Sequence, residues 1–217
     1  MSVPHSVPAA LLAPHERRAR RVRGLVVALA LVVGLLLVTL IDRWVWERFT
    51  LDRATFESVE RKDWYQLFRQ VGYLPAWFIA AVFMWWAEGK LRRASMVFLA
   101  AALGGAAAEV LKGVVQRFRP GTNGEYVFRW VMDEVPGGEL VRGLGLASSH
   151  AGVAFGGAMM VAALWPRVGA VAVALAVGCC VTRLISGAHF LSDVYVAGVL
   201  SYGVVRGLLA VDGRRAG

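Results

Sequence analysis

The chain has 217 residues, of which 58% are hydrophobic, and its mean hydropathy is +0.56. These values exclude an ordinary soluble domain and indicate one integral membrane domain. The net charge of +9 would suit a nucleic-acid partner, but no basic stripe with interleaved aromatic residues marks a soluble nucleic-acid-binding module. Arginines instead flank apolar runs, where membrane topology requires them. We therefore expect the membrane as a partner and no nucleic acid.

The sequence offers neither a disulfide framework nor a metal site. Cys179 and Cys180 are adjacent in one apolar run, so a bridge between them would be strained. Of the four histidines, only His150 and His189 lie in the apolar body. No cluster with metal-ligand spacing results, and we expect no metal and no other cofactor.

The N-terminal third begins with a polar tail. Residues 1–23 contain three prolines and then five arginines, a composition typical of a disordered cytoplasmic tail. A first span at about 24–41 follows, and it lacks the small-residue cleavage site of a signal peptide, so we expect an uncleaved anchor. Residues 42–71 mix charges with aromatic side chains, which predicts amphipathic helices at the membrane interface. A packed connector and a lid over a lipid-entry gap are alternative roles for this segment.

The remaining apolar runs complete an all-α, six-transmembrane-helix bundle with an interfacial amphipathic segment. Small residues in two of the runs, including Gly104, Gly105, Gly152 and Gly156, predict close helix contact. The single membrane domain is expected to cover residues 24–211. Its five further spans are predicted at about 73–87, 94–115, 149–164, 168–182 and 188–209.

Six spans place both termini on the same side of the membrane. The arginine cluster before the first span assigns that side, with the polar tail at 212–217, to the cytoplasm of a bacterial-type inner membrane. Under this topology, three polar stretches at 112–120, 147–150 and 182–193 converge on the extracytoplasmic side.

The stretch 182–193 carries Arg183, His189 and Asp193 between two apolar runs. Ionisable groups at membrane depth are costly, and a functional site is the default hypothesis for them. A four-residue spacing on a helix lets the Asp193 carboxylate accept the Nδ1 proton of His189, which leaves Nε2 as a nucleophile or base. Arg183 supplies a planar set of donors for phosphate or carboxylate. In the alternative reading, Arg183 and Asp193 only neutralise each other and His189 packs between them.

A second group of polar residues lies at the end of the third span. Lys112 and Arg119 are seven residues apart and share a helix face if the helix persists to Phe118. Glu109 precedes Lys112 by three residues, so we expect it to pair with the lysine and hold it in place. Helix ends near membrane surfaces are commonly basic, and Arg117 is assigned to that ordinary role.

The fourth span opens with Ser148, Ser149 and His150. Ser148 can cap the helix, and its first free N–H groups favour a bound anion. Together the three stretches supply two histidines, a carboxylate and three cations at one membrane level. This set fits phosphoryl transfer without a metal, because such a transition state needs mainly positioning and charge neutralisation.

These stretches carry a family resemblance. The sequences KGVVQRFRP (Lys112 to Pro120), ASSH (Ala147 to His150) and TRLISGAHFLSD (Thr182 to Asp193) resemble the three signature motifs of type 2 phosphatidic acid phosphatases. The first matches the pattern of Lys, six residues and Arg-Pro in full. The second departs from Pro-Ser-Gly-His at two places, and the third has Thr182 where serine is usual. The six-span layout agrees with membrane members of this family.

The resemblance implies a mechanism. His189 attacks phosphorus to form a phosphohistidine, Asp193 orients it, and His150 protonates the leaving oxygen and later activates water. The expected substrates are lipid phosphates or diphosphates of the glycerolipid or polyprenyl class, and the departures at Ala147 and Ser149 bear on substrate range or rate. The phosphate oxygens would be held by Lys112, Arg119, Ser148, Ser149 and Arg183.

Three alternative functions are compatible with parts of this pattern. A lipid phosphotransferase would use the same phosphohistidine. A catalytically weak lipid-binding or transport protein would have no need of His150, His189 and Asp193. Vanadate-dependent haloperoxidases resemble the same motifs, but the apolar spans oppose that reading. The sequence assigns no oligomeric state.

Overall fold

The computed structural model describes residues 14–121, 124–128 and 143–215. These ranges form eight α-helices and, apart from isolated bridges, no β-structure, which confirms the predicted all-α class. In chain order the helices are α1 (Pro14–Phe49), α2 (Arg53–Glu60), α3 (Asp63–Gln70), α4 (Leu74–Glu88), α5 (Leu91–Val115), α6 (Ser149–Leu164), α7 (Pro166–Ile185) and α8 (Leu191–Arg215).

Four helices are long and apolar enough to cross a membrane, namely α1, α5, α7 and α8. Helices α3 and α4 meet the same criterion only together, and they are bent by 74° where they join. Helix α6 is apolar but has only 16 residues. The described chain is therefore a membrane protein with four candidate spans, or five if the bent pair is one span, and the predicted count of six is not confirmed.

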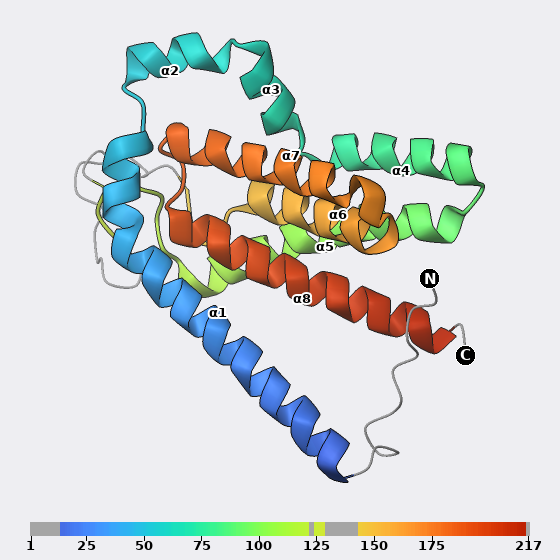
Figure 1. Cartoon of the computed structure of the whole chain (residues 1–217). Coiled ribbons are helices and arrows are strands. Elements are labelled where there is room, and N and C mark those ends of the chain that lie inside the picture. Colours follow the sequence, from blue (N-terminus) through green and yellow to red (C-terminus); the bar gives the residue numbers. More distant parts are fainter. Residues whose placement is uncertain (1–13, 122–123, 129–142, 216–217) are drawn as a thin grey trace.

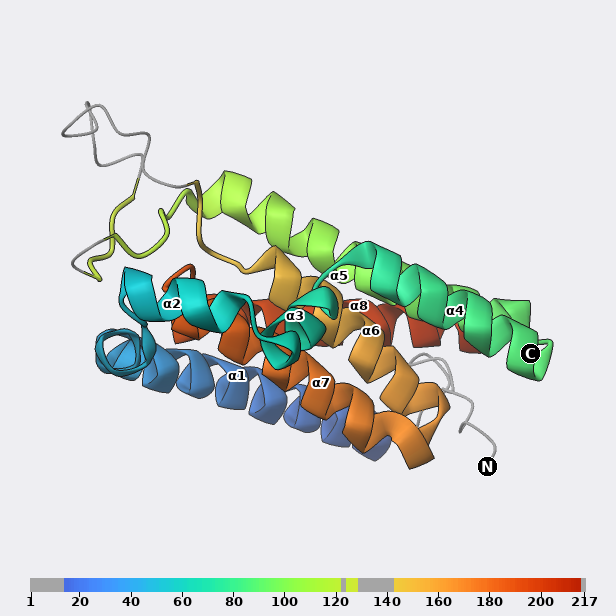
Figure 2. The same cartoon turned by 90° about the horizontal axis from the view of Figure 1, so that it is seen from above.

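The centre of the fold is a bundle in which α6 packs against α5, α7 and α8 (Figures 1 and 2). Its contact with α5 is close because small residues line both helices, as the sequence predicts. A Cβ atom at Gly156 would overlap the carbonyl oxygen of Ala100, and one at Gly104 would overlap that of Gly152. Ser201 of α8 donates a hydrogen bond of 2.9 Å to the Gly152 carbonyl, so α8 is joined to the same contact.

Tight turns join the helices at one end of this bundle. Gly89 has a φ of +67° and ends α4, and α5 starts two residues later. Pro166 opens α7 directly after α6. The C-terminal ends of α5 and α7 and the N-terminal ends of α6 and α8 lie together at the opposite end (Figure 1). All predicted site residues lie near that opposite end.

Helix α1 corrects two predicted boundaries. It begins at Pro14, so the second half of the predicted disordered tail is helical, and it continues to Phe49, so residues 42–49 belong to the first span and not to the interfacial segment. Arg43 and Glu47 form an exposed i, i+4 ion pair of 2.9 Å, which suits a continuing helix. At the chain's other end, α8 runs to Arg215 through most of the predicted polar tail.

The C-terminal half of α1 lies against the bundle, where it contacts α7 and α8 (Figure 1). This contact reaches the middle of α1, where the Tyr195 hydroxyl of α8 donates a 3.0 Å hydrogen bond to the Leu31 carbonyl. The backbone N–H of Leu51 donates to the Ile185 carbonyl at 3.0 Å and fixes the end of α1 beside the end of α7. Helices α2 and α3 follow, and α3 packs on α7 through the buried side chain of Tyr65. Both are amphipathic, and their predicted position at the membrane interface stays a prediction.

Candidate active site

The predicted pair of His189 and Asp193 is formed at the start of α8. Helix α7 ends at Ile185, and Gly187, with a φ of +65°, turns the chain back. Asp193 lies in the first turn of α8, where its Oδ2 accepts a 2.9 Å hydrogen bond from the backbone N–H of Phe190 and lies 3.3 Å from His189 Nδ1. His189 precedes the helix, so the contact arises from the turn and not from a shared helix face.

This geometry sets the state of the imidazole. Because the carboxylate accepts at Nδ1, that nitrogen carries the proton and Nε2 is unprotonated. Burial lowers the pKa of His189, the hydrogen bond to Asp193 opposes this shift without cancelling it, and the cations Arg183 and Arg119 lower the pKa further. A lowered pKa favours the neutral imidazole that a nucleophile requires.

The cation that pairs with Asp193 is Arg117. Its Nη2 donates to Asp193 Oδ1 at 2.5 Å and to Ser192 Oγ at 2.9 Å, and the residue is only 5% exposed. Among the described residues, Arg117 and not Arg183 therefore neutralises Asp193. The ordinary surface role assigned to Arg117 from the sequence is wrong.

The end of α5 explains this difference. The helix stops at Val115, and Gln116 takes a left-handed conformation with a φ of +53°. The helix does not persist to Phe118, so Lys112 and Arg119 do not share a helix face as predicted. The chain continues in an extended form, in which Phe118 bridges Leu144 on the segment that leads to α6.

Lys112 lies in the last turn of α5 and joins that helix to α6. Its Nζ donates to Glu109 Oε1 at 2.7 Å and to Ser149 Oγ at 2.9 Å, and the residue is 7% exposed. The predicted contact between Glu109 and Lys112 is confirmed. Ser149, which stands where the family motif has glycine, uses its hydroxyl to hold this lysine.

Ser148 connects α6 with the start of α8. It is the N-cap of α6, and its hydroxyl accepts from the Ala151 N–H at 3.5 Å, as the sequence predicts. Its own backbone N–H donates to the Asp193 carbonyl at 3.2 Å. The N-terminal ends of α6 and α8 are thus joined directly.

His150 follows in the first turn of α6. Its ring meets the Tyr73 ring edge-on at 4.7 Å, and a Cβ at Gly72 would lie 2.9 Å from its own Cβ, so the junction of α3 and α4 covers it on one side. Within the described part of the chain, His150 Nε2, Arg119 Nε and Arg183 Nε are buried without a hydrogen-bond partner. Buried polar nitrogens are normally satisfied, and a bound anion would satisfy the two guanidinium groups.

The described residues contain no group of three or more His, Cys, Asp or Glu side chains that could hold a metal ion. A sequence profile described as PAP2 superfamily matches residues 93–216, which is more than half of the chain. The matched part includes every predicted site residue. No curated protein and no solved structure matches the chain significantly.

Proposed function

Because the chain belongs to the PAP2 superfamily, which generally comprises phosphatases that act on phosphate esters, we propose that it hydrolyses a lipid phosphate or diphosphate through a phosphohistidine. The observation that carries this proposal is the His189–Asp193 pair at the end of the bundle that also holds buried, unpaired nitrogens of Arg119, Arg183 and His150. Arg69 Nε and Arg117 Nε are unpaired as well, but their guanidinium groups already form ion pairs with Glu60 and Asp193. Nucleophile, orienting carboxylate and anion-binding donors are the parts that phosphoryl transfer needs.

The proposed reaction has two steps. In the first, His189 Nε2 forms a bond to the terminal phosphorus while the bond from that phosphorus to the leaving oxygen breaks, and His150 gives that oxygen a proton. The leaving oxygen is the ester oxygen of a monophosphate or the bridging oxygen of a diphosphate. In the second, His150 takes a proton from water, the resulting hydroxide attacks phosphorus, and the phosphorus–nitrogen bond breaks. The products are the lipid alcohol, or the lipid monophosphate from a diphosphate, and inorganic phosphate, with both histidines restored.

The phosphate oxygens are held by cations and by the start of α6. Arg119 and Arg183 provide guanidinium donors, and Lys112 adds a positive charge positioned by Glu109 and Ser149. Ser148 stabilises the first turn of α6, where free backbone N–H groups favour an anion. All of these groups neutralise charge that develops in the transition state.

We further propose that the site faces the extracytoplasmic side of the inner membrane and that both termini lie in the cytoplasm. In this topology, α4 and α6 cross the membrane in addition to the four candidate spans α1, α5, α7 and α8. The arginine cluster before the first span supports this orientation. A reporter enzyme that is active only outside the cytoplasm, fused after Gly217, should be inactive. An active fusion would reverse the orientation.

The experiment that tests the function is phosphate release by the purified protein in detergent. The substrates are a diacylglycerol phosphate, a polyprenyl monophosphate and a polyprenyl diphosphate, each assayed with and without an acceptor lipid. We expect phosphate release that His189→Ala abolishes and that His15→Ala, at the exposed start of α1, leaves unchanged. Phosphoryl transfer to the acceptor without release would indicate a phosphotransferase, and neither reaction would indicate a lipid-binding protein.

A further inference from the structure

Arg117 is enclosed at the start of α8. Besides its hydrogen bonds to Ser192 and Asp193, its guanidinium group lies 4.9 Å from the centre of the Tyr126 ring and 5.3 Å from that of Phe190. The two rings contact each other edge-on, with their centres 4.8 Å apart, and the cation that lies against this pair is stabilised by both rings. This arginine therefore has the fixed geometry of a binding-site residue, although the substrate is not expected to touch it.

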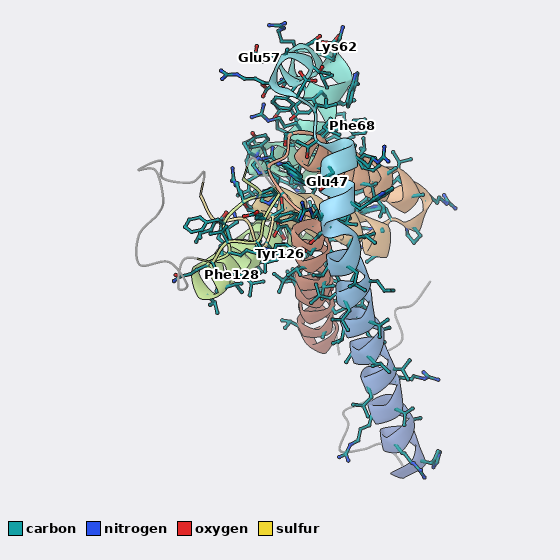
Figure 3. All side chains as sticks on the ribbon, turned by 90° about the vertical axis from the view of Figure 1, so that its left-hand side faces the viewer. Glu47, Glu57, Lys62, Phe68, Tyr126 and Phe128 are labelled. Atoms are coloured by element: carbon teal, nitrogen blue, oxygen red, sulfur yellow. The ribbon has the colours of Figure 1, made fainter. Side chains whose placement is uncertain are left out.

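A second carboxylate supports this arrangement from α1. Asp42 is fully buried, and it accepts from the Ser192 N–H through Oδ1 at 2.8 Å and from the Tyr126 hydroxyl through Oδ2 at 2.7 Å. Burial and the bond to Asp42 raise the pKa of Tyr126, so its hydroxyl stays a donor. Figure 3 shows Tyr126 beside the end of α1 that carries Glu47. Asp42 thereby joins α1 to the start of α8 through Oδ1, and through Oδ2 it holds the tyrosine whose ring lies over Arg117.

We propose that Arg117, supported by Tyr126 and Asp42, is the positioning residue that fixes the Asp193 carboxylate against His189. This inference rests on the proposed function, in which His189 is the nucleophile. Arg117 belongs to neither the catalytic nor the phosphate-binding residues proposed above. Under this inference, Asp42 of α1 helps to hold the nucleophile's partner in place.

The proposal rests on the different partners of the two carboxylate oxygens of Asp193. Arg117 occupies Oδ1, so Oδ2 is left to accept from Phe190 and His189. A carboxylate held by a charged donor on one oxygen cannot rotate away from the imidazole without breaking a short, charge-assisted bond. Asp193 is also fully buried, and a buried carboxylate without a paired cation is strongly unfavourable.

The charge of Arg117 also affects the protonation of His189. Without that cation, the negative charge of Asp193 would act more strongly on the imidazole, which would then take up a proton at higher pH. The other titratable groups that face the pair remain in place in such a variant. They are Arg119 after α5, His150 of α6, Arg183 of α7, and Tyr126 with Asp42 of α1.

The first test compares two substitutions of Arg117 by steady-state kinetics across pH. Arg117→Met should lower kcat by about 10- to 100-fold, as loss of an orienting partner typically does, with a smaller change in KM. The acid limb of kcat/KM should move up by about one pH unit. Arg117→Lys keeps the charge but not the planar fork, so kcat should fall while the limb stays in place. Arg53→Met, which removes an arginine from an exposed ion pair of α2, is the matched control and should change neither quantity.

A milder variant guards against failure to fold. Tyr126→Phe keeps the ring over Arg117 and removes the hydroxyl that donates to Asp42, so kcat should fall by about two- to tenfold. The melting temperature in detergent should fall less than in Arg117→Met, because Asp42 keeps its bond from Ser192 whereas Asp193 would lose its cation. A folded Arg117→Met protein with wild-type kcat and pH profile would overturn the proposal. So would a Tyr126→Phe protein with wild-type kcat if Arg117→Met does not fold.

A second readout separates this inference from the proposed function. In histidine-labelled protein without substrate, the NMR titration of His189, assigned by its loss in His189→Ala, should shift to higher pH in Arg117→Met and stay in place in Arg53→Met. An unchanged titration would overturn the positioning role even in an active enzyme. If the wild-type protein released no phosphate from any ester, the proposed function would fail, and the titration would still test the contact.

Discussion

The two histidines have different duties in the proposed reaction, and a change of leaving group separates them. His150 supplies a proton to the leaving oxygen, which matters most when that oxygen departs as an alkoxide and least when it departs as a stable phenolate. Its Nε2 has no hydrogen-bond partner among the described residues, so none of these residues competes for that proton. Proton transfer of this kind contributes about 10²- to 10⁴-fold. At about 1.4 kcal/mol per tenfold, His150→Ala removes about 3 to 6 kcal/mol of transition-state stabilisation with a lipid phosphomonoester.

The assay measures kcat/KM for a lipid phosphomonoester and for a nitrophenyl phosphate. His150→Ala should lose at least about tenfold more activity on the lipid ester than on the aryl ester, because the aryl ester needs little of the proton transfer. His189→Ala should lose both activities alike, since every substrate needs the nucleophile. His15→Ala serves as the control. Equal losses on the two substrates in His150→Ala would refute its role as the general acid.

Three further predictions concern the lysine, the helix contact and the metal requirement. Glu109→Gln should lower activity only partially, about two- to tenfold, because it weakens the 2.7 Å ion pair with Lys112 while the lysine keeps its bond to α6. Gly156→Ala should destabilise the protein by about 1 to 3 kcal/mol, seen as a lower melting temperature in detergent, because the added Cβ overlaps the α5 backbone. Gly203→Ala, where a Cβ meets nothing within 4 Å, is the control and should be neutral or slightly stabilising. Phosphate release should persist in EDTA, because the proposed reaction balances charge with protein cations.

A specific outcome would contradict each of these three predictions. A loss in Glu109→Gln as large as that in His189→Ala would make the glutamate part of the catalytic set. Equal melting temperatures for Gly156→Ala and Gly203→Ala would show that α5 and α6 do not pack as closely as described. Activity abolished by EDTA and restored by magnesium would require a metal in the reaction.

The helices were predictable from the sequence because their signals are local. Apolar runs bounded by proline, glycine and serine predict both ends of α4 to α7 within three residues, and Ser149–Leu164 has the predicted bounds. Helix α8 starts three residues after the predicted span and ends six residues beyond it. The small residues of α5 and α6 also predict their contact, since Gly104 and Gly156 leave no side chain between the backbones. The boundaries of α1 were less predictable, because charged and aromatic residues suit a continuing helix as well as an interfacial one.

Arg117 was not predictable from helix spacing, because its position depends on where α5 ends. One residue in a left-handed conformation, Gln116, turns the chain so that the arginine reaches Asp193, 76 residues away. The sequence did contain one unused signal. Asp42 follows an apolar run directly, and a carboxylate at that depth is itself a reason to expect a functional contact. Its actual partners, Ser192 and Tyr126, lie 150 and 84 residues further along the chain.

The most direct test of the proposed mechanism is to trap the covalent intermediate. Protein mixed with a substrate labelled in the transferred phosphate is quenched in base, where phosphohistidine survives, and the labelled peptide is identified by mass spectrometry. The label should lie on His189 in the wild-type protein. With an aryl phosphate as substrate, more label should remain on His189 in the His150→Ala protein, because loss of the general base slows hydrolysis of the phosphohistidine more than it slows its formation. His189→Ala should carry no label. A phosphohistidine that persists in His189→Ala, or a label on His150, would contradict the assignment of His189 as the nucleophile.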